Sequence, residues 1–400
     1  MLTNIFLFTI VNNYLQAISL LLALPSSILF IECMAALLPK RNHANYSNHQ
    51  PKICVLIPAH DEANSIQNTL AAIYVSTTNV QILVVADNCT DKTADIARAE
   101  GATVIERFDL QNRGKGYALD FGFKYLSANP PDVVVVIDAD CTVHSGTIQR
   151  LATMAVSTNR PVQATNLLKA PKNFTARHAV STLAFLVKNL VRQRGCARLG
   201  VPASLTGTGM AFPWCLVEKV GFASGNIVED KQTGLDFTLA GFAPVFCEEA
   251  LVTGYFPEQQ QAGNTQRTRW VHGHLQTLLT QVPRLLVAAI QQKRFNLIAI
   301  ALDLSVLPIS LLVMLWLLSF TFALFTSIIL GIAWLSTLII GIEGLFIIIA
   351  ITSAWFKFGR TDLPARSLIT IPFYIIWNLG IYLSFLLKPQ KTWVRTQRDA

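Results

Sequence analysis

The residues with the clearest chemical potential are two aspartates that follow a run of valines. Residues 133–137 read VVVVI, and Asp138 and Asp140 come directly after them. Two carboxylates at this spacing can hold Mg²⁺ or Mn²⁺, and Mg²⁺ in proteins typically combines one or two carboxylates with substrate phosphates. An ordinary acidic turn has the same letters, but the end of a buried strand favours a metal site.

Two other stretches carry charge beside an apolar run or a turn. Asp87 follows QILVVA at 81–86, and the next letters, NCTD, are typical of a helix cap, which is compatible with Asp87 facing a ligand. Lys115 stands between Gly114 and Gly116, where a cation at a helix start would suit a phosphate. Taken alone, these three residues are more typical of an ordinary glycine turn.

The segment from 207 to 230 supplies a glycine pair and an acidic pair. The letters GTG at 207–209 do not form a dinucleotide-binding fingerprint, because Phe212 stands where the third glycine would be. A phosphate-binding GxxxxGK[ST] loop is also absent from the sequence. Glu229 and Asp230 are candidates for a general base, with a solvated acidic loop as the alternative.

The stretch QRTRWVHGH at 266–274 combines arginine, tryptophan and histidine. Gln266, Arg269 and Trp270 have the spacing i, i+3, i+4, so one helix face can present all three. Arginine binds phosphate oxygens, and an indole face packs against a sugar ring. The alternative is a belt at a membrane interface, where both types are enriched. For His272 and His274 we expect a surface or packing role.

The pattern of the first half predicts the elements that position these residues. Apolar strands alternate with helical patterns, which indicates a parallel sheet covered on both faces. Ligands of such sheets lie outside the carboxyl ends of the strands, so Asp87 and the Asp138–Asp140 pair are expected to face one crevice. After residue 150 the pattern blurs, although 174–191 is typical of an amphipathic helix. The predicted strands are 53–57, 81–86, 103–105 and 133–137.

Composition places the chain at a membrane. Only 14% of its 400 residues are charged and 52% are hydrophobic, whereas soluble domains carry roughly 25% charged residues. Three apolar runs are long enough to span a bilayer, which takes roughly 20 residues. We predict four spanning helices: one in the run at 14–38, two in the second run at 296–356 and one in the run at 367–387. The predicted segments are an N-terminal spanning helix at 1–38, a cytoplasmic domain at 39–270, an interfacial helix at 271–295, spanning helices at 296–388 and a basic tail at 389–400.

The net charge of +8 fits an anionic membrane surface better than nucleic acid, because no dense tract of Lys and Arg with interleaved aromatics occurs. A transporter with a nucleotide-binding domain is a different class of function. Its candidate residues would be Asp303 and Glu343, the charges of the second apolar run. The concentration of charged motifs before residue 271 argues against it.

In their order along the chain, these motifs resemble those of the membrane-integrated family 2 glycosyltransferases, the group of the cellulose, hyaluronan and chitin synthases. One departure is Val228, which stands where many members have threonine before the acidic pair. The matching motifs are IPAHDE (57–62), Asp87 in VVADNCTD, GKG (114–116), DAD (138–140), GTGMAF (207–212), VEDKQTG (228–234) and QRTRW (266–270).

The resemblance implies a fold and a role for each motif. The fold would be an α/β GT-A domain, a Rossmann-like nucleotide-sugar-binding sheet, combined with transmembrane and interfacial helices. Glu62 and Asp87 would contact the nucleoside, and Asp140 would ligate Mg²⁺ or Mn²⁺. The remaining roles are the base, Asp230, with its support, Glu229; the diphosphate-binding residues Lys115, Asp138, Gln266 and Arg269; and the acceptor side, formed by Trp270, Gly207, Thr208 and Gly209.

The function implied by the resemblance is inverting transfer of a hexosyl or N-acetylhexosaminyl group from a nucleotide-sugar, with a UDP-sugar favoured. The acceptor would be a growing polysaccharide, or alternatively a lipid that receives a single sugar. We expect an integral protein of the bacterial plasma membrane with its catalytic domain in the cytoplasm, membrane lipids as partners and no nucleic acid.

Overall fold

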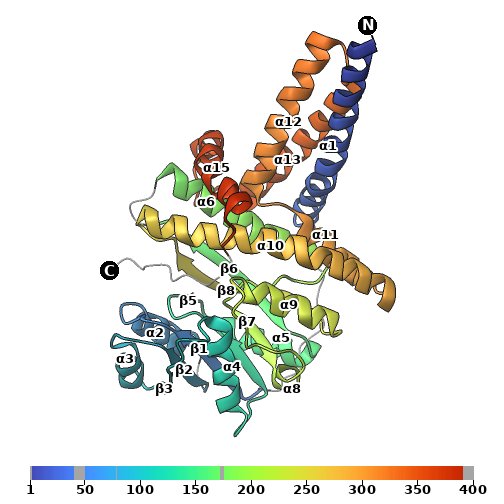
Figure 1. Cartoon of the computed structure of the whole chain (residues 1–400). Helices are drawn as coiled ribbons and strands as arrows, with labels where there is room; N and C mark the ends of the chain where they lie inside the picture. Colours follow the sequence, from blue (N-terminus) through green and yellow to red (C-terminus); the bar gives the residue numbers. More distant parts are fainter. Residues whose placement is uncertain (1, 40–49, 78, 172–174, 391–400) are drawn as a thin grey trace.

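The computed structural model of the chain describes residues 2–39, 50–77, 79–171 and 175–390. An eight-stranded sheet with strand order β3-β2-β1-β4-β7-β6-β8-β5 carries the polar half of the chain (Figure 1). The strands are β1 (Ile53–Ala59), β2 (Gln81–Asp87), β3 (Thr103–Arg107), β4 (Val133–Val136), β5 (Thr142–Val143), β6 (Val162–Lys169), β7 (Met210–Pro213) and β8 (Val245–Tyr255).

The first four strands are parallel and sit where the apolar runs predict them. Ile53 pairs with Val133 and Cys54 with Gln81, so β1 lies between β4 and β2. Helices α2 and α5 pack on one face of the sheet, and α4, α8 and α9 pack on the other. These helices are α2 (Ile66–Ser76), α3 (Thr93–Ala99), α4 (Lys115–Leu126), α5 (Thr147–Thr158), α8 (Trp214–Val217) and α9 (Glu229–Leu239).

The second half of the sheet, for which the sequence pattern predicts no strand direction, is mixed. Strand β7 runs antiparallel to both β4 and β6, β5 runs antiparallel to β8, and β6 is parallel to β8. A loop at residues 200–209 leads into β7. In that loop Gly207 and Gly209 have φ of +90° and +66°, a region that favours glycine.

A helical layer lies between the sheet and the apolar helices. Helix α6 (Ala176–Leu186) continues through a π-helical turn, η1 (Val187–Arg192), into α7 (Gln193–Leu199). Helix α10 (Gln260–Gln292) is a single helix of 33 residues that crosses beneath them (Figure 1). The predicted domain boundary at 270/271 therefore falls inside one helix, because the catalytic and interfacial patterns share it.

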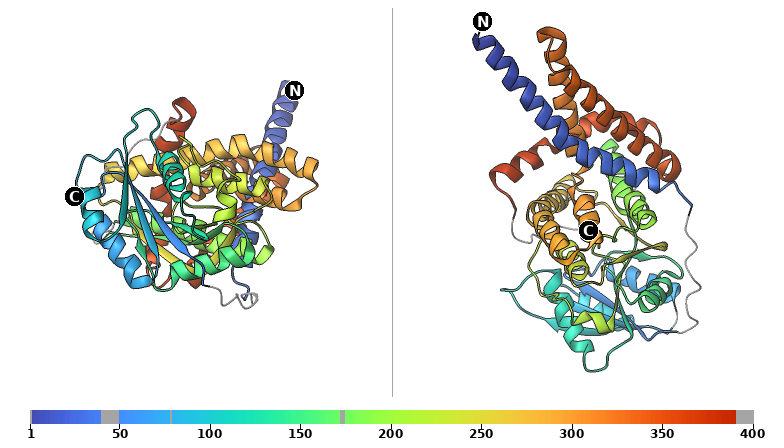
Figure 2. Two further views of the ribbon diagram at one scale, coloured as in Figure 1. Left: turned by 90° about the horizontal axis from the view of Figure 1, so that it is seen from below. Right: turned by 90° about the vertical axis from the view of Figure 1, so that its right-hand side faces the viewer.

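Three helices are long and apolar enough to cross a membrane, judged by length and composition: Phe8–Ala35, Ile309–Leu330 and Trp334–Gly359. They rise together away from the sheet (Figures 1 and 2). A fourth predicted span is α15, which has 17 residues and is about 25 Å long, less than a bilayer core of about 30 Å. The helices of this region are α1 (Leu2–Ala35), α11 (Phe295–Ser305), α12 (Ile309–Leu330), α13 (Trp334–Ala354), η2 (Trp355–Gly359), α14 (Arg366–Ile369) and α15 (Ile371–Leu387).

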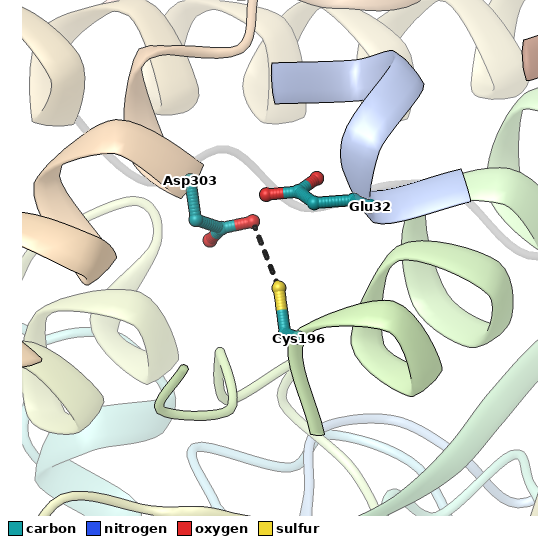
Figure 3. Close-up of side chains that lie close together, drawn as sticks. All are labelled: Glu32, Cys196 and Asp303. Carbon is teal, nitrogen blue, oxygen red and sulfur yellow. Dashed lines mark hydrogen bonds between the residues drawn. The ribbon is translucent and has the colours of Figure 1, made fainter. Parts of the chain in front are cut away.

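A buried ion-pair cluster joins α1 and α11 to the helical layer. Glu32, Cys196 and Asp303 lie close together, and the Cys196 thiol is 3.8 Å from Asp303 Oδ1 (Figure 3). Arg192 Nε donates to Glu32 Oε2 at 2.5 Å, and its Nη2 donates to Asp303 Oδ1 at 2.7 Å. Because one guanidinium bonds both carboxylates, the group is an ion-pair network that docks helices, and not a metal site. Asp303 therefore has a structural partner, which weakens the transporter interpretation.

Candidate active site

Most of the residues singled out in the sequence line one cavity of about 180 Å³ at the carboxyl end of β4. It lies between the sheet edge and helix α10, so segments more than 150 residues apart contribute to it. The predicted residues that line it are Lys115, Asp138, Asp140, Gly207, Thr208, Glu229, Asp230, Gln266, Arg269 and Trp270.

Lys115, at the first turn of α4, ties the end of β4 to the glycine loop. Its ammonium group pairs with Asp138 Oδ1 and donates to the carbonyl oxygen of Gly207 at 2.6 Å. Burial by itself lowers the pKa of Lys115, but the charges of Asp138, Glu229 and Asp230 outweigh this and raise it above its usual value. The site therefore holds a permanent cation among its carboxylates.

The aspartate pair fits a divalent ion. Ligand atoms of Asp138, Asp140 and Cys141 all lie within 4.8 Å of one another. Carboxylate oxygens are the hard ligands that Mg²⁺ and Mn²⁺ prefer. Burial raises the pKa of the Cys141 thiol well above its usual value, so the sulfur remains a protonated neighbour of Asp140. The donor set is thus the two carboxylates, and the cavity beside them leaves space for phosphate oxygens.

Glu229 and Asp230 begin helix α9 on the other side of the cavity. Burial, reinforced by the charge of Asp230 and partly offset by Lys115, raises the pKa of Glu229 to about 7. Asp230 Oδ1 accepts a hydrogen bond from the backbone N–H of Lys231 at 2.8 Å. A Cβ on Gly207 would lie 3.4 Å from Asp230 Oδ2, so the glycine keeps the space in front of this carboxylate open.

Helix α10 presents its predicted face to the same cavity. Gln266, Arg269 and Trp270 all line it, as their helical spacing indicates. The Trp270 ring lies 5.7 Å from the ring of Phe185 on α6, which gives the cavity an aromatic side. A close approach between helices sets this position: a Cβ on Gly273 would come within 2.5 Å of Val228 Cγ1. Val228, the departure from the family pattern, therefore packs directly against Gly273 of α10.

The comparisons with known proteins agree with this geometry. Residues 51–273, more than half of the chain, match the family model described as "Glycosyltransferase like family 2". The chain belongs to the family 2 glycosyltransferases. Among its relatives is the probable glycosyltransferase YdaM of Bacillus subtilis, which is 28% identical over 243 residues. That alignment covers 57% of this chain and 56% of YdaM, so the chain spans about half the length of this relative.

Two further matches extend the picture of this family 2 glycosyltransferase. The 4,4'-diaponeurosporenoate glycosyltransferase of Staphylococcus aureus is 33% identical over 98 residues, covering 24% of this chain and 25% of the relative. The solved structure of the mannosyltransferase PcManGT from Pyrobaculum calidifontis, in complex with GDP-Man and Mn²⁺, has a TM-score of 0.54 and 16% identity. That likeness covers 94% of this chain and 100% of PcManGT, and it shows the GT-A fold.

Three predicted site residues of this glycosyltransferase lie outside the cavity lining. Asp87 is buried at the end of β2, where Arg107 Nη1 donates to its Oδ1 at 2.6 Å. Glu62 Oε2 accepts a hydrogen bond from Ser65 at 2.6 Å. Both stand at carboxyl ends of adjacent parallel strands, and contact with a nucleoside stays a prediction. Neighbouring side chains pack closely around Gly209, since a Cβ at this position would lie 2.8 Å from the Cβ of Ala164.

Of the two histidines of the 266–274 stretch, His272 is buried and His274 is half-buried, and both contact neighbouring elements. His274 Nε2 donates to the carbonyl oxygen of Val306 at 3.0 Å, and its Nδ1 accepts from Lys231 Nζ at 2.6 Å. Burial, reinforced by the nearby charge of Lys231, lowers the pKa of His274 well below its usual value, so the ring is neutral. His272 accepts from the backbone N–H of Gln390 at 3.1 Å.

Lys188 is among the cavity residues that the sequence pattern does not indicate. It lies in the π-helical turn η1 and lines the cavity together with Asp230 and Trp270. Burial lowers its pKa, and Asp230 counteracts part of this shift. Turns of this kind are rare and often occur at functional sites. The one signal in the sequence is a lysine within the apolar run FLVKNLV at 185–191, which is also typical of a membrane-surface helix.

Proposed function

We propose that this chain is an inverting glycosyltransferase that moves a hexosyl or N-acetylhexosaminyl group from a nucleotide-sugar to a hydroxyl-bearing acceptor at a membrane. The observation that carries this proposal is the shared cavity, in which Asp230 faces the Asp138–Asp140 pair and the cations Lys115 and Arg269. A carboxylate, a metal-binding pair and phosphate-binding cations are the groups that such a transfer requires.

In the proposed step, the acceptor oxygen forms a bond to the anomeric carbon on the face opposite the diphosphate. The bond from that carbon to the diphosphate oxygen breaks, and its electron pair leaves with the diphosphate. The acceptor proton passes to Asp230, which acts as general base. Direct displacement of this kind inverts the anomeric centre, and the reacting carbon becomes oxocarbenium-like as in glycoside hydrolysis.

Asp140 and Asp138 would hold Mg²⁺ or Mn²⁺, with Lys115 fixing the orientation of Asp138. When bound, such an ion stabilises negative charge on phosphate oxygens as a Lewis acid. Gln266 and Arg269 would bind the diphosphate from α10, because a guanidinium forks onto phosphate oxygens. Glu62 and Asp87 would contact the nucleoside. The family resemblance favours a UDP-sugar, and the GDP-Man complex of PcManGT makes a GDP-sugar the first alternative to test.

Two acceptors are candidates. A growing polysaccharide fits the aromatic side of the cavity, where Trp270 and Phe185 can pack against a sugar ring. A lipid that receives a single sugar fits a different observation: a second cavity adjoins the site beside Trp270 and extends between the helices α6, α10 and α15. The second observation favours the lipid. Product length on a gel separates the two, because only polymer extension gives a ladder.

The proposal is tested by incubating the purified full-length protein with a panel of UDP- and GDP-sugars and measuring release of the nucleoside diphosphate. We expect release with one donor, loss of release on chelation with EDTA, and recovery on addition of Mn²⁺ or Mg²⁺. Asp140→Asn should raise the Mn²⁺ concentration needed for half-maximal release. Release that continues in EDTA would contradict the metal role, and no release with any donor would contradict the function.

A further inference from the structure

A second cavity of about 150 Å³ begins where the candidate active site ends. Phe185, Lys188 and Trp270 line both spaces, so the two cavities are neighbours across these side chains. The second one lies among α6, α10, α15 and the segment that leads into α12. Figure 1 shows α6, α10 and α15 between the sheet and the apolar helices. A molecule in this cavity would therefore reach the active site from the membrane side.

The charged groups of this cavity are basic. Among the described residues that line it there is no acidic side chain. Arg192 is already paired with Glu32 and Asp303, but Lys188 and Arg267 have no carboxylate on this surface. Both side chains are half-buried. Cations removed from water are normally paired, so two of them beside an empty volume favour an anionic ligand.

Two contacts fix the guanidinium of Arg267, but one of its amino groups has no hydrogen-bond partner among the described residues. Its Nη2 donates to Ser181 Oγ at 3.0 Å, and its guanidinium lies 5.3 Å from the ring centre of Tyr374. The other amino group, Nη1, is buried and has no hydrogen-bond partner among the described residues. A planar guanidinium fixed by a hydroxyl and an aromatic ring, with a free donor, is typical of a site for a phosphate or carboxylate.

A second unsatisfied group lines the same space. Asn378 on α15 is 1% exposed, and its Oδ1 has no hydrogen-bond partner among the described residues. Its Nδ2 donates to Ser310 Oγ at 3.4 Å, and Ser310 also bonds the Tyr382 hydroxyl at 2.6 Å. Buried amide oxygens are nearly always paired, so this one is suited to a hydroxyl donor on a ligand.

An apolar cavity adjoins the second one. A third, smaller cavity shares Ala184, Ile309, Ser310 and Tyr374 with it. The other side chains that line this third space are aliphatic: Val180, Leu183, Val187, Val313, Ile351 and Ile371. Two of the contributing helices, α12 and α13, are candidate membrane spans. From Asp140 outward, the lining therefore changes from acidic to basic and then to hydrocarbon.

We propose that the second and third cavities bind the acceptor, and that this acceptor is an amphiphile with an anionic phosphate or carboxylate in its headgroup. This inference rests on the proposed function and names its acceptor class. Arg267 and Lys188 bind the anionic group, the aliphatic cavity takes the start of the hydrocarbon chain, and the reacting hydroxyl passes Trp270 toward Asp230. Arg267 acts here as a specificity residue and takes no part in the bond changes.

The test measures binding of three probes to the full-length protein in phosphatidylcholine nanodiscs, with empty nanodiscs subtracted. The probes are radiolabelled dodecyl phosphate, dodecanol and inorganic phosphate. We expect dodecyl phosphate to bind at least ten-fold more tightly than either of the others. Equal binding of dodecanol would mean a neutral lipid or a glycan end, and equal binding of inorganic phosphate would mean a free anion; either result overturns the proposal.

Substitutions test whether Arg267 and Lys188 are responsible for the binding of dodecyl phosphate. Arg267→Gln should weaken dodecyl phosphate at least ten-fold, whereas Arg267→Lys should weaken it about three-fold or less. Arg284→Gln is the matched control, because Arg284 lies on the same helix, pairs with Asp236 and is outside this cavity. If Arg267→Gln does not fold, Lys188→Gln removes the second cation and should also weaken the probe. Unchanged binding in the folded variants overturns the proposal.

The two proposals can fail separately. Binding of the nucleoside diphosphate with Mn²⁺ should be the same in Arg267→Gln and in the unaltered protein, because Arg267 lies outside the donor cavity. Donor turnover without selective binding of dodecyl phosphate would remove the acceptor class and leave the glycosyltransferase. Selective binding of dodecyl phosphate without turnover of any donor would remove the glycosyltransferase.

Discussion

Lys231 Nζ lies 2.6 Å from Nδ1 of His274 and joins the helix that carries the proposed base to the helix that carries Arg269. The other ring nitrogen of His274 donates to Val306, just before α12. One neutral imidazole thus connects α9, α10 and the link between α11 and the candidate membrane span α12, which gives the histidine a structural role.

Because of the neutral imidazole of His274, we expect the stability of the protein to depend on pH. The pKa of His274 is well below its usual value in the folded protein, so below pH of about 6.5 the unfolded chain binds a proton that the folded one does not. The free energy of unfolding should therefore fall as the pH drops, by at most about 1.4 kcal/mol per pH unit. His274→Asn should show a smaller fall, measured by thermal unfolding in detergent between pH 8 and pH 5.5. An unchanged slope in the variant would contradict this assignment.

Substitution of Glu229 should change the stability and the activity of the protein in opposite directions at pH 8. Its pKa of about 7 lies above the usual value, so between about pH 4.5 and 7 the folded state binds the extra proton and loses stability as the pH rises. Glu229→Gln should therefore be more stable than the unaltered protein at pH 8. It should also lose activity there, because Glu229 lines the cavity directly beside the proposed base Asp230. Thermal unfolding and the pH–rate profile check both, and a variant that is less stable at pH 8 would contradict the assignment.

The contact of Val228 with Gly273 should show as a coupled pair of substitutions. Gly273→Ala places a Cβ within 2.5 Å of Val228 Cγ1, and overpacking of this kind costs about 1–3 kcal/mol. Val228→Ala removes the clashing methyl groups and should restore most of the melting temperature in the double variant. The measurement is a double-mutant cycle of thermal unfolding. Additive effects would mean that the two residues do not set the distance between α9 and α10.

Much of the site could be predicted because its groups stand at ends of regular elements. The valine run before Asp138, and the helical spacing of Gln266, Arg269 and Trp270, each indicate a position from local sequence. The strands of the second half could not be predicted in direction, since β7 follows a loop whose path depends on long-range pairing. Lys188 was missed because a π-helical turn has no distinct periodicity in sequence.

The length of α10 and the pairing of the charged residues near the candidate membrane spans could not be predicted from local sequence. The predicted boundary at 270/271 follows the end of the QRTRW motif, but hydrogen bonds continue along one helix through Gln292. In the sequence, Glu32 and Asp303 each stand among apolar residues, and their partner Arg192 lies more than 100 residues away from both.

Arg192 should be essential for the docking of α1 and α11. Arg192→Met leaves Glu32 and Asp303 buried without their cation, and breaking a buried pair in this way costs about 3–5 kcal/mol. The triple variant with Glu32→Gln and Asp303→Asn removes the unpaired charges and should recover much of this loss. Thermal unfolding in detergent provides the measurement. A single variant as stable as the unaltered protein would show that the cluster does not hold the helices.

The central claim is that Asp230 removes the acceptor proton, and Asp230→Asn tests it most directly. The measurement is transfer of label from a nucleotide-sugar to the membrane fraction, together with the affinity for the donor and Mn²⁺. Asp236→Asn, on the same helix but paired with Arg284, is the matched control and should keep its activity. We predict that Asp230→Asn lowers the transfer rate by at least about 100-fold while donor affinity changes less than about three-fold. Transfer at the rate of the Asp236→Asn control would contradict the account.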